Sequence, residues 1–173
     1  MPTLSWRDYL TLDDATLFAQ CEFDRFRASG PGGQKRNRTN SAVRLRHRPS
    51  GLHAEANESR SQHENRARAL RRLRQTIALS LRSDVSPPDY TPSAALAAAL
   101  LHAPSSRAPS RLPVFAELFD LLEVSRWRLS EAAQHLNATT AALSRLLASD
   151  DDVWRAAAEA RARYGLSALH ADA

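Results

Sequence analysis

The sequence predicts an α+β fold, in which a small β-sheet packs on one long basic helix and carries an extended glycine-rich loop, followed by a small all-α C-terminal region. Three observations support this prediction: an alternating apolar pattern around a Pro-Ser-Gly turn, a helical apolar repeat behind a capping serine, and a second helical region beyond a proline-rich stretch. Four segments follow along the chain: an acidic stretch (1–24), a basic domain (25–82), a Pro/Ser/Ala-rich linker (83–112) and a helical region (113–173).

Residues 41–57 have the pattern of a β-hairpin. Two residue types alternate along the first strand, with Val43, Leu45 and His47 on one face and Arg44, Arg46 and Arg48 on the other. After the turn at 49–51 the alternation resumes through residue 56, as expected for the second strand. Phe23 and Phe26 predict a further strand before the hairpin.

A long helix is predicted to follow the hairpin. Ser61 and Glu64 have the spacing of a capping box, in which the serine side chain accepts a hydrogen bond from the backbone three residues later. Apolar residues then recur at intervals of three and four, at Leu70, Leu73, Ile77 and Leu81. Arginines occupy the other faces of this helix.

Six of the nine prolines lie between residues 83 and 113, which predicts a linker, interrupted by one short Ala/Leu-rich helix at 93–102. We expect Pro113 to open an amphipathic helix.

Residues 132–147 have the apolar spacing of a helix-turn-helix, with Asn137 at the turn position that favours positive φ. Asp150 is expected to cap a last helix, and Gly165 to end it.

Charge is distributed unevenly along the chain. The net charge is +5, but residues 25–82 hold 15 Lys and Arg against three acids, a net +12, so the remainder carries −7. A basic block within a folded domain indicates a surface for a polyanion, and arginine in particular makes bidentate contacts with phosphate. A solvated charged face is the alternative.

Composition excludes several classes of protein. The single cysteine, Cys21, allows no intramolecular disulfide, and no histidine pair has the spacing of a metal site, so we expect neither metal nor cofactor. The sequence has no signal pattern and no apolar run of the roughly 18 residues that a membrane helix needs. A cytoplasmic protein is expected.

The segment 27–39 is the candidate for chemistry. Three glycines and a proline at 30–33 allow a backbone that approaches another molecule closely, and Gln34 follows them. The segment contains no Asp, Glu, His or Cys, and Ser29 has no histidine beside it, so acid–base and nucleophilic catalysis lack a suitable group. Catalysis by positioning a water molecule remains, with a mobile surface turn as the alternative.

Several spaced motifs between about Arg25 and Arg74 together resemble one known family. They are Gly-Pro-Gly-Gly-Gln at 30–34, Asn37, Thr39, Ser-Ala-Val-Arg at 41–44, the Pro-Ser-Gly turn, Glu-Ser-Arg-Ser-Gln-His at 58–63, Asn65 and Ala69-Leu70. This region resembles the GGQ domain of bacterial class I peptide chain release factors, and it is similar to their stop-codon-independent rescue relatives.

The resemblance implies an ester hydrolase that acts on peptidyl-tRNA only with the ribosome. Gly32, Gly33 and Gln34 would form the catalytic tip in the peptidyl-transferase centre, where Gln34 helps to orient the attacking water. The residues expected to bind RNA are Ser29, Gly30, Lys35, Arg36, Asn37, Arg38, Thr39, Arg44, Arg46, Arg60, His63, Asn65 and Arg68. For His63, and for His47, structural hydrogen bonding or core packing is an equal alternative. A glutamine methyltransferase acting on Gln34, as in the family, is a partner that the sequence leaves open.

The sequence departs from the family in three ways. Lys35-Arg36 replaces the usual His-Val, only 24 residues precede Arg25, and the chain from Ser83 onward carries a net −3 where rescue hydrolases have a basic tail. Because only 24 residues precede Arg25, we expect no stop-codon-reading domain before it. Codon-independent release or rescue is therefore the expected function. The alternative is a non-catalytic RNA- or DNA-binding protein derived from a release factor, with the helix-turn-helix for recognition.

Overall fold

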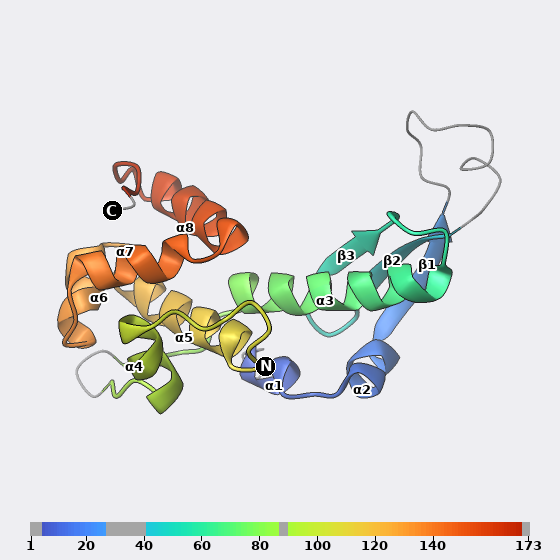
Figure 1. The fold of residues 1–173 in the computed structure, drawn as a ribbon, viewed down its shortest axis with the longest axis horizontal. Helices are drawn as coiled ribbons and strands as arrows, with labels where there is room; N and C mark the ends of the chain where they lie inside the picture. Colours follow the sequence, from blue (N-terminus) through green and yellow to red (C-terminus); the bar gives the residue numbers. More distant parts are fainter. Residues whose placement is uncertain (1–4, 27–40, 87–89, 171–173) are drawn as a thin grey trace. The chain divides into compact units, whose positions relative to one another are not determined.

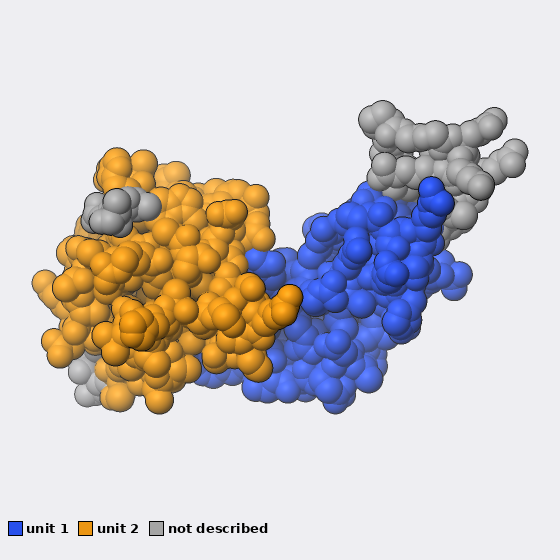
Figure 2. Space-filling view, in the orientation of Figure 1, with its two compact units in different colours: residues 1–80 blue, residues 81–173 orange. Residues whose placement is uncertain are grey.

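The chain forms two compact units, residues 1–80 and 81–173 (Figure 2). The computed structural model describes residues 5–26, 41–86 and 90–170 (Figure 1). A small antiparallel sheet and helices make up the first unit, and helices make up the described part of the second. The α+β class predicted from the sequence is confirmed.

The sheet of the first unit has three antiparallel strands in the order β1 (Cys21–Phe26), β2 (Ala42–His47) and β3 (His53–Ala56). The predicted hairpin is confirmed: Val43, Leu45 and His47 are fully buried, and the arginines between them are exposed. The strand predicted from the phenylalanines is also present. It begins four residues before Arg25, because residues 21–24 pair with residues 44–47 of β2.

Helix α3 (Gln62–Ser80) packs on β2 and β3. Its predicted start is confirmed, since the Ser61 hydroxyl accepts a hydrogen bond from the Glu64 backbone N–H at 3.3 Å. Leu73 and Ile77 are completely buried and form the centre of the core. The helix ends at Ser80, so Leu81 lies just beyond it.

Two short helices precede the sheet, α1 (Arg7–Leu10) and α2 (Asp14–Ala19), and neither was predicted. Their connection is fastened to α3 by Arg74, whose guanidinium donates to the Leu12 carbonyl at 2.7 Å and to the Asp14 carboxylate at 2.8 Å. The acidic N-terminal stretch is therefore part of the first folded unit. Its buried side chains are Trp6, Tyr9 and Leu17.

The second unit is built around α5 (Arg111–Val124), in which every residue from 114 to 122 is buried. Around it lie α4 (Ala94–Leu101), α6 (Leu129–His135), α7 (Thr140–Ala148) and α8 (Asp151–Arg163). Helix α5 begins two residues before the predicted start at Pro113. Proline is tolerated there because the first turn of a helix needs no N–H donors.

The turns of the second unit follow the sequence signals. Asn137 has φ of 49°, and the Thr139 side chain accepts from the Ala142 N–H at 3.1 Å to cap α7. Asp150 caps α8 through the backbone N–H groups of residues 152 and 153, and Gly165, with φ of 66°, follows its end. No helix in the described ranges is long and apolar enough to cross a membrane.

The segment before α4, predicted as a linker, is anchored on α5 by two buried carboxylates. Glu117 accepts hydrogen bonds from the Tyr90 hydroxyl at 2.8 Å and from the Ser93 N–H at 2.8 Å and hydroxyl at 2.6 Å. Asp120 accepts from the Ser83 N–H at 2.9 Å. These bonds give a segment with few apolar residues a fixed place on the helical core.

Candidate functional site

The predicted catalytic segment is inserted between two neighbouring strand ends. Phe26, at the end of β1, pairs with Ala42, at the start of β2. Gly32, Gly33 and Gln34 lie outside the described residues, as do the expected RNA contacts Ser29, Gly30, Lys35, Arg36, Asn37, Arg38 and Thr39. The described part of the site is therefore the surface around these strand ends.

The two arginines expected to bind RNA from β2 both point outward, and each has an acidic neighbour. Arg44 Nε lies 2.6 Å from Glu55 Oε1, and Arg46 Nη1 lies 3.7 Å from Glu22 Oε2. All four side chains are substantially exposed. Exposed pairs of this kind are weak, so these guanidinium groups can exchange an internal partner for an external one at little cost.

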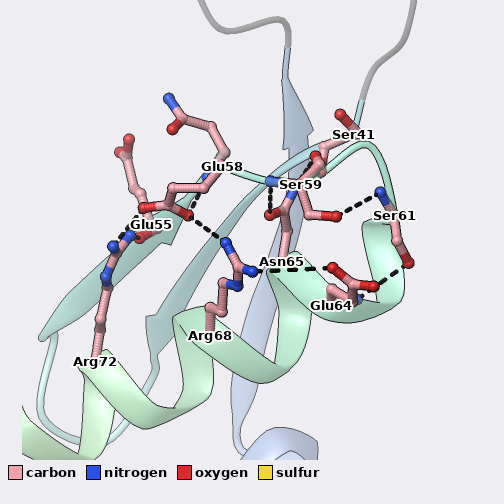
Figure 3. A network of polar contacts seen from close by, with 10 residues as sticks. Ser41, Glu55, Glu58, Ser59, Ser61, Glu64, Asn65, Arg68 and Arg72 are labelled. Carbon is pink, nitrogen blue, oxygen red and sulfur yellow. Dashed lines mark hydrogen bonds and ion pairs between the residues drawn. The ribbon is translucent and has the colours of Figure 1, made fainter.

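A denser ionic network joins the first turns of α3 to β3 and the connection between them (Figure 3). Arg68 lies 3.9 Å from both Glu58 and Glu64, while Arg72 donates to Glu58 and, at 2.6 Å, to the Glu55 carbonyl. Burial acts to raise the pKa of Glu58, but hydrogen bonding to Arg72 and to the backbone outweighs it, and the pKa is lowered. The three acids of residues 25–82 are therefore all engaged with arginines.

Because these acids are so few, several basic side chains on the same unit face solvent without an acidic partner in the described ranges. The side chains of Arg60, His63 and Arg71 are exposed and make no hydrogen bond or ion pair with any residue in the described ranges. Arg66 lies over the Phe18 ring at 5.1 Å and Arg25 over the Phe23 ring at 5.8 Å. We did not single out Arg25, Arg66 or Arg71 from the sequence, although the excess of arginines over acids already implied such residues.

Two adjoining shallow cavities are lined by some of these basic side chains. One, of 450 Å³, is lined by α2 and α3 residues that include Phe18, His63 and Arg66. The other, of 340 Å³, shares these three residues and extends to Phe23 and Arg25 of β1. Ring faces and guanidinium planes of this kind can stack on flat or anionic groups. No group of three metal-ligating side chains occurs in the described ranges.

Asn65, expected to contact RNA, is instead completely buried. Its amide oxygen accepts from the Ser59 N–H at 2.9 Å, and its amide nitrogen donates to the carbonyls of Ser41 at 2.7 Å and Ser59 at 2.8 Å. Both N–H donors are thus used within the protein. In this structure Asn65 holds backbone and presents nothing to a ligand, a role that its spacing in the motif did not reveal.

His47 is also buried, and its structural role is confirmed. Its Nε2 lies 2.9 Å from Gln20 Oε1 and its Nδ1 2.7 Å from Ser50 Oγ, while the Tyr9 ring packs edge-on against it. Since an amide oxygen only accepts, the bond network assigns the proton of the neutral ring to Nε2. Burial lowers the pKa of His47.

These features define a class: a small basic α+β domain with a glycine-rich segment inserted between the neighbouring ends of two strands. Residues 16–91 match the RF-1 domain family. The chain therefore carries an RF-1 domain, the domain of bacterial class I release factors that contains the GGQ motif.

Its relatives include several proteins named peptide chain release factor 1. That of Paracidovorax citrulli (strain AAC00-1) is 45% identical over 84 residues, which are 49% of this chain and 22% of the relative. That of Leptothrix cholodnii (strain ATCC 51168 / LMG 8142 / SP-6) is 58% identical over 52 residues, 30% of this chain and 14% of the relative. The chain thus spans less than a quarter of the length of these relatives.

Proposed function

We propose that this chain hydrolyses the ester bond of peptidyl-tRNA on the ribosome, with Gly32, Gly33 and Gln34 at the reaction centre. The observation that carries the proposal is the RF-1 domain match over residues 16–91, which contains this Gly-Gly-Gln sequence. Because the segment 27–39 has no acid, histidine or cysteine, its contribution is positional: Gln34 orients water, and backbone N–H groups stabilise the oxyanion. The peptidyl-transferase RNA and the tRNA complete the site.

The arginine-rich surface of the first unit supports binding to RNA. Arg60, Arg66 and Arg71 are exposed cations without an acidic partner in the described ranges, so they meet phosphate without first breaking an ion pair. Arg44, Arg46 and Arg68 contribute by exchanging their exposed carboxylate partners for phosphate. Residues 1–80 carry 15 basic against 8 acidic side chains, which supports the same assignment.

The release reaction is proposed to be independent of the codon, as in ribosome rescue. Neither a Pro-x-Thr nor a Ser-Pro-Phe decoding motif occurs in the sequence of this chain. Methylation of Gln34 by a glutamine methyltransferase belongs to the same proposal, and mass spectrometry of the protein purified from its own cells tests it: a mass increase of one methyl group on Gln34 is expected.

Single-turnover peptide release on three kinds of ribosome tests the function. The substrates are ribosomes stalled on a truncated message, ribosomes with a sense codon in the vacant A site, and ribosomes with a stop codon there. We expect release from stalled ribosomes, with no preference for the stop codon, and loss of release in Gln34→Ala. Gln134→Ala, the same change on the exposed surface of α6, is the matched control and should release peptide normally. Release confined to stop codons would contradict rescue, and none at all would contradict hydrolysis.

A second candidate, nucleic-acid recognition by the second unit, is favoured by one observation. Helices α6 and α7 are joined by a tight turn at Asn137, with Thr139 capping α7, as in a helix-turn-helix. Residues 81–173 nevertheless carry 9 arginines against 11 acids, and Arg145 is the only basic residue of α7. Titration with duplex DNA separates the two: release of peptide without DNA binding supports hydrolysis, and steeply salt-dependent DNA binding without release supports recognition.

A further inference from the structure

Asn65 is a buried amide that links separate segments of the first unit. It lies in the first turn of α3, and its side chain is completely buried. Three hydrogen bonds between 2.7 and 2.9 Å join its amide to Ser41 and Ser59 (Figure 3). One side chain therefore connects α3 to the residue before β2 and to the segment between β3 and α3.

The bond to Ser41 lies next to the end of the described strand pairing. Among the described residues, the ladder between β1 and β2 runs as far as the pair Phe26 and Ala42, and Ser41 immediately precedes β2. The Ser41 carbonyl accepts a hydrogen bond from the Asn65 amide at 2.7 Å, across 24 residues of sequence. Ser41 is the residue at which the chain rejoins the sheet after the catalytic segment, and Asn65 fixes its position.

The other two bonds make this anchor rigid. Ser59 is bound to the Asn65 amide through both its N–H and its carbonyl, and its hydroxyl accepts from the Ser61 N–H at 3.0 Å. Glu58, beside Ser59, is bound by Arg72 from about two turns further along α3. The segment between β3 and α3 is therefore bound to α3 at several points.

We propose that Asn65 is a positioning residue for peptide release: it sets where the segment carrying Gly33 and Gln34 returns to the domain. This inference rests on the proposed function. Asn65 makes no contact with substrate in this role. It acts through the Ser41 carbonyl, and the expected consequence of its loss is misplacement of the catalytic tip.

Asn65→Asp is the sharpest test, because it keeps the shape of the side chain, removes its two N–H donors and adds a negative charge. A carboxylate oxygen would then face the carbonyls of Ser41 and Ser59, which repel it. Asn57→Asp is the matched control, since Asn57 is exposed at the end of β3 and the change alters the charge of the domain equally. Asn65→Ala, which adds no charge, serves if the Asp variant does not fold.

Single-turnover release from stalled ribosomes is measured against protein concentration. We expect the maximal rate of Asn65→Asp to fall about 100-fold, the effect of a displacement near 1 Å, while the half-saturating concentration stays within about threefold. Asn57→Asp should retain the wild-type rate. A folded Asn65 variant with the wild-type maximal rate would overturn the proposal, and so would a loss seen only in the half-saturating concentration.

Amide hydrogen exchange provides a readout that does not depend on release. In a folded variant, exchange should accelerate in residues 41–43 while the central amides of α3 keep their protection. Unchanged exchange at residues 41–43 overturns the inference by itself. If the wild-type protein releases no peptide, the proposed function fails, but this exchange comparison still decides whether Asn65 holds Ser41.

Discussion

The two units of the chain use charge in opposite ways. In residues 1–80 the arginines of β2 and α3 lie mostly on the surface, and their few acidic partners are exposed with them. In residues 81–173 the carboxylates of Glu117 and Asp120 are buried within α5, where they bind the preceding segment. Charge on the first unit remains available to an external partner, whereas charge within the second maintains the fold.

This contrast predicts that equivalent substitutions have different consequences in the two units. Removing a cation that pairs with a buried carboxylate of the second unit should cost stability, because that carboxylate would lose its counter-charge. Removing one from the first should leave stability nearly unchanged and alter binding instead. The predictions below run from the largest expected effect to the smallest.

Arg82→Met should destabilise the second unit by about 3 kcal/mol, because it leaves the buried Asp120 without its cation. Arg82 Nη1 lies 3.6 Å from Asp120 Oδ1 and also donates to the Ala116 carbonyl. Burial lowers the pKa of Arg82 to about 10, with Asp120 opposing the shift, so the side chain is charged at neutral pH. Hydrogen exchange of α5 amides in increasing urea measures the loss.

The control for this prediction is Arg155→Met, which breaks an exposed pair with Asp152 in the same unit. It should cost no more than about 0.5 kcal/mol. Equal costs for the two variants would contradict the assigned role of the buried carboxylates.

Acidification should destabilise the first unit through His47. Burial holds its folded-state pKa below the ordinary value of about 6.5, so the stabilisation is complete above that pH and is lost as the pH falls through 6.5 toward the folded-state pKa. In that window the free energy of unfolding should decrease by up to about 1.4 kcal/mol per pH unit. His47→Gln should remove this component, while His63→Gln, at an exposed site, should retain it. An identical pH profile for His47→Gln would show that His47 does not cause the effect.

Asn137→Ala should destabilise the second unit by about 1 kcal/mol, since alanine tolerates the φ of 49° less well than asparagine. Asn137→Gly should be neutral or slightly stabilising at the same position. Urea unfolding followed through α6 and α7 amides measures both variants. A larger loss for glycine than for alanine would mean that the Asn137 side chain, not its backbone conformation, matters.

Arg71→Gln should change stability by less than about 0.5 kcal/mol but reduce the slope of log affinity against log salt by about 1 for ribosome binding. Arg44→Gln should reduce this slope less, because Arg44 has Glu55 as an internal partner. Anisotropy titrations over a range of salt concentrations measure both slopes. A larger decrease in this slope for Arg44→Gln than for Arg71→Gln would contradict the proposal that unpaired arginines contribute more to binding than paired ones.

Local signals predicted the elements that depend on nearby residues. The alternation through Val43 and Leu45, the Ser61 cap and the turn at Asn137 each involve residues within a few positions, and the structure has all three. The helices α1 and α2 were missed because they are short and are held by Arg74 from 60 or more residues away. Tertiary contacts of that range leave no periodic pattern in the sequence.

The sequence predicted that the site is basic, but it did not predict which of its side chains pair or are buried. An excess of arginine indicated a basic surface, yet the pairing of Arg44 with Glu55 and of Arg72 with Glu58 depends on how α3 packs beside β3. The burial of Asn65 likewise follows from the junction of three segments. A motif shows that a residue type recurs at a position, but it does not distinguish a side chain that contacts a ligand from one that holds the backbone.

The most direct test of the central claim is the single-turnover rate at which Gly33→Ala releases peptide from stalled ribosomes. A methyl group at this position obstructs close approach of the backbone to the ester, so the rate should fall at least about 100-fold while ribosome affinity is unchanged. A Gly33→Ala protein that releases peptide at the wild-type rate would contradict the assignment of the glycine-rich segment to catalysis.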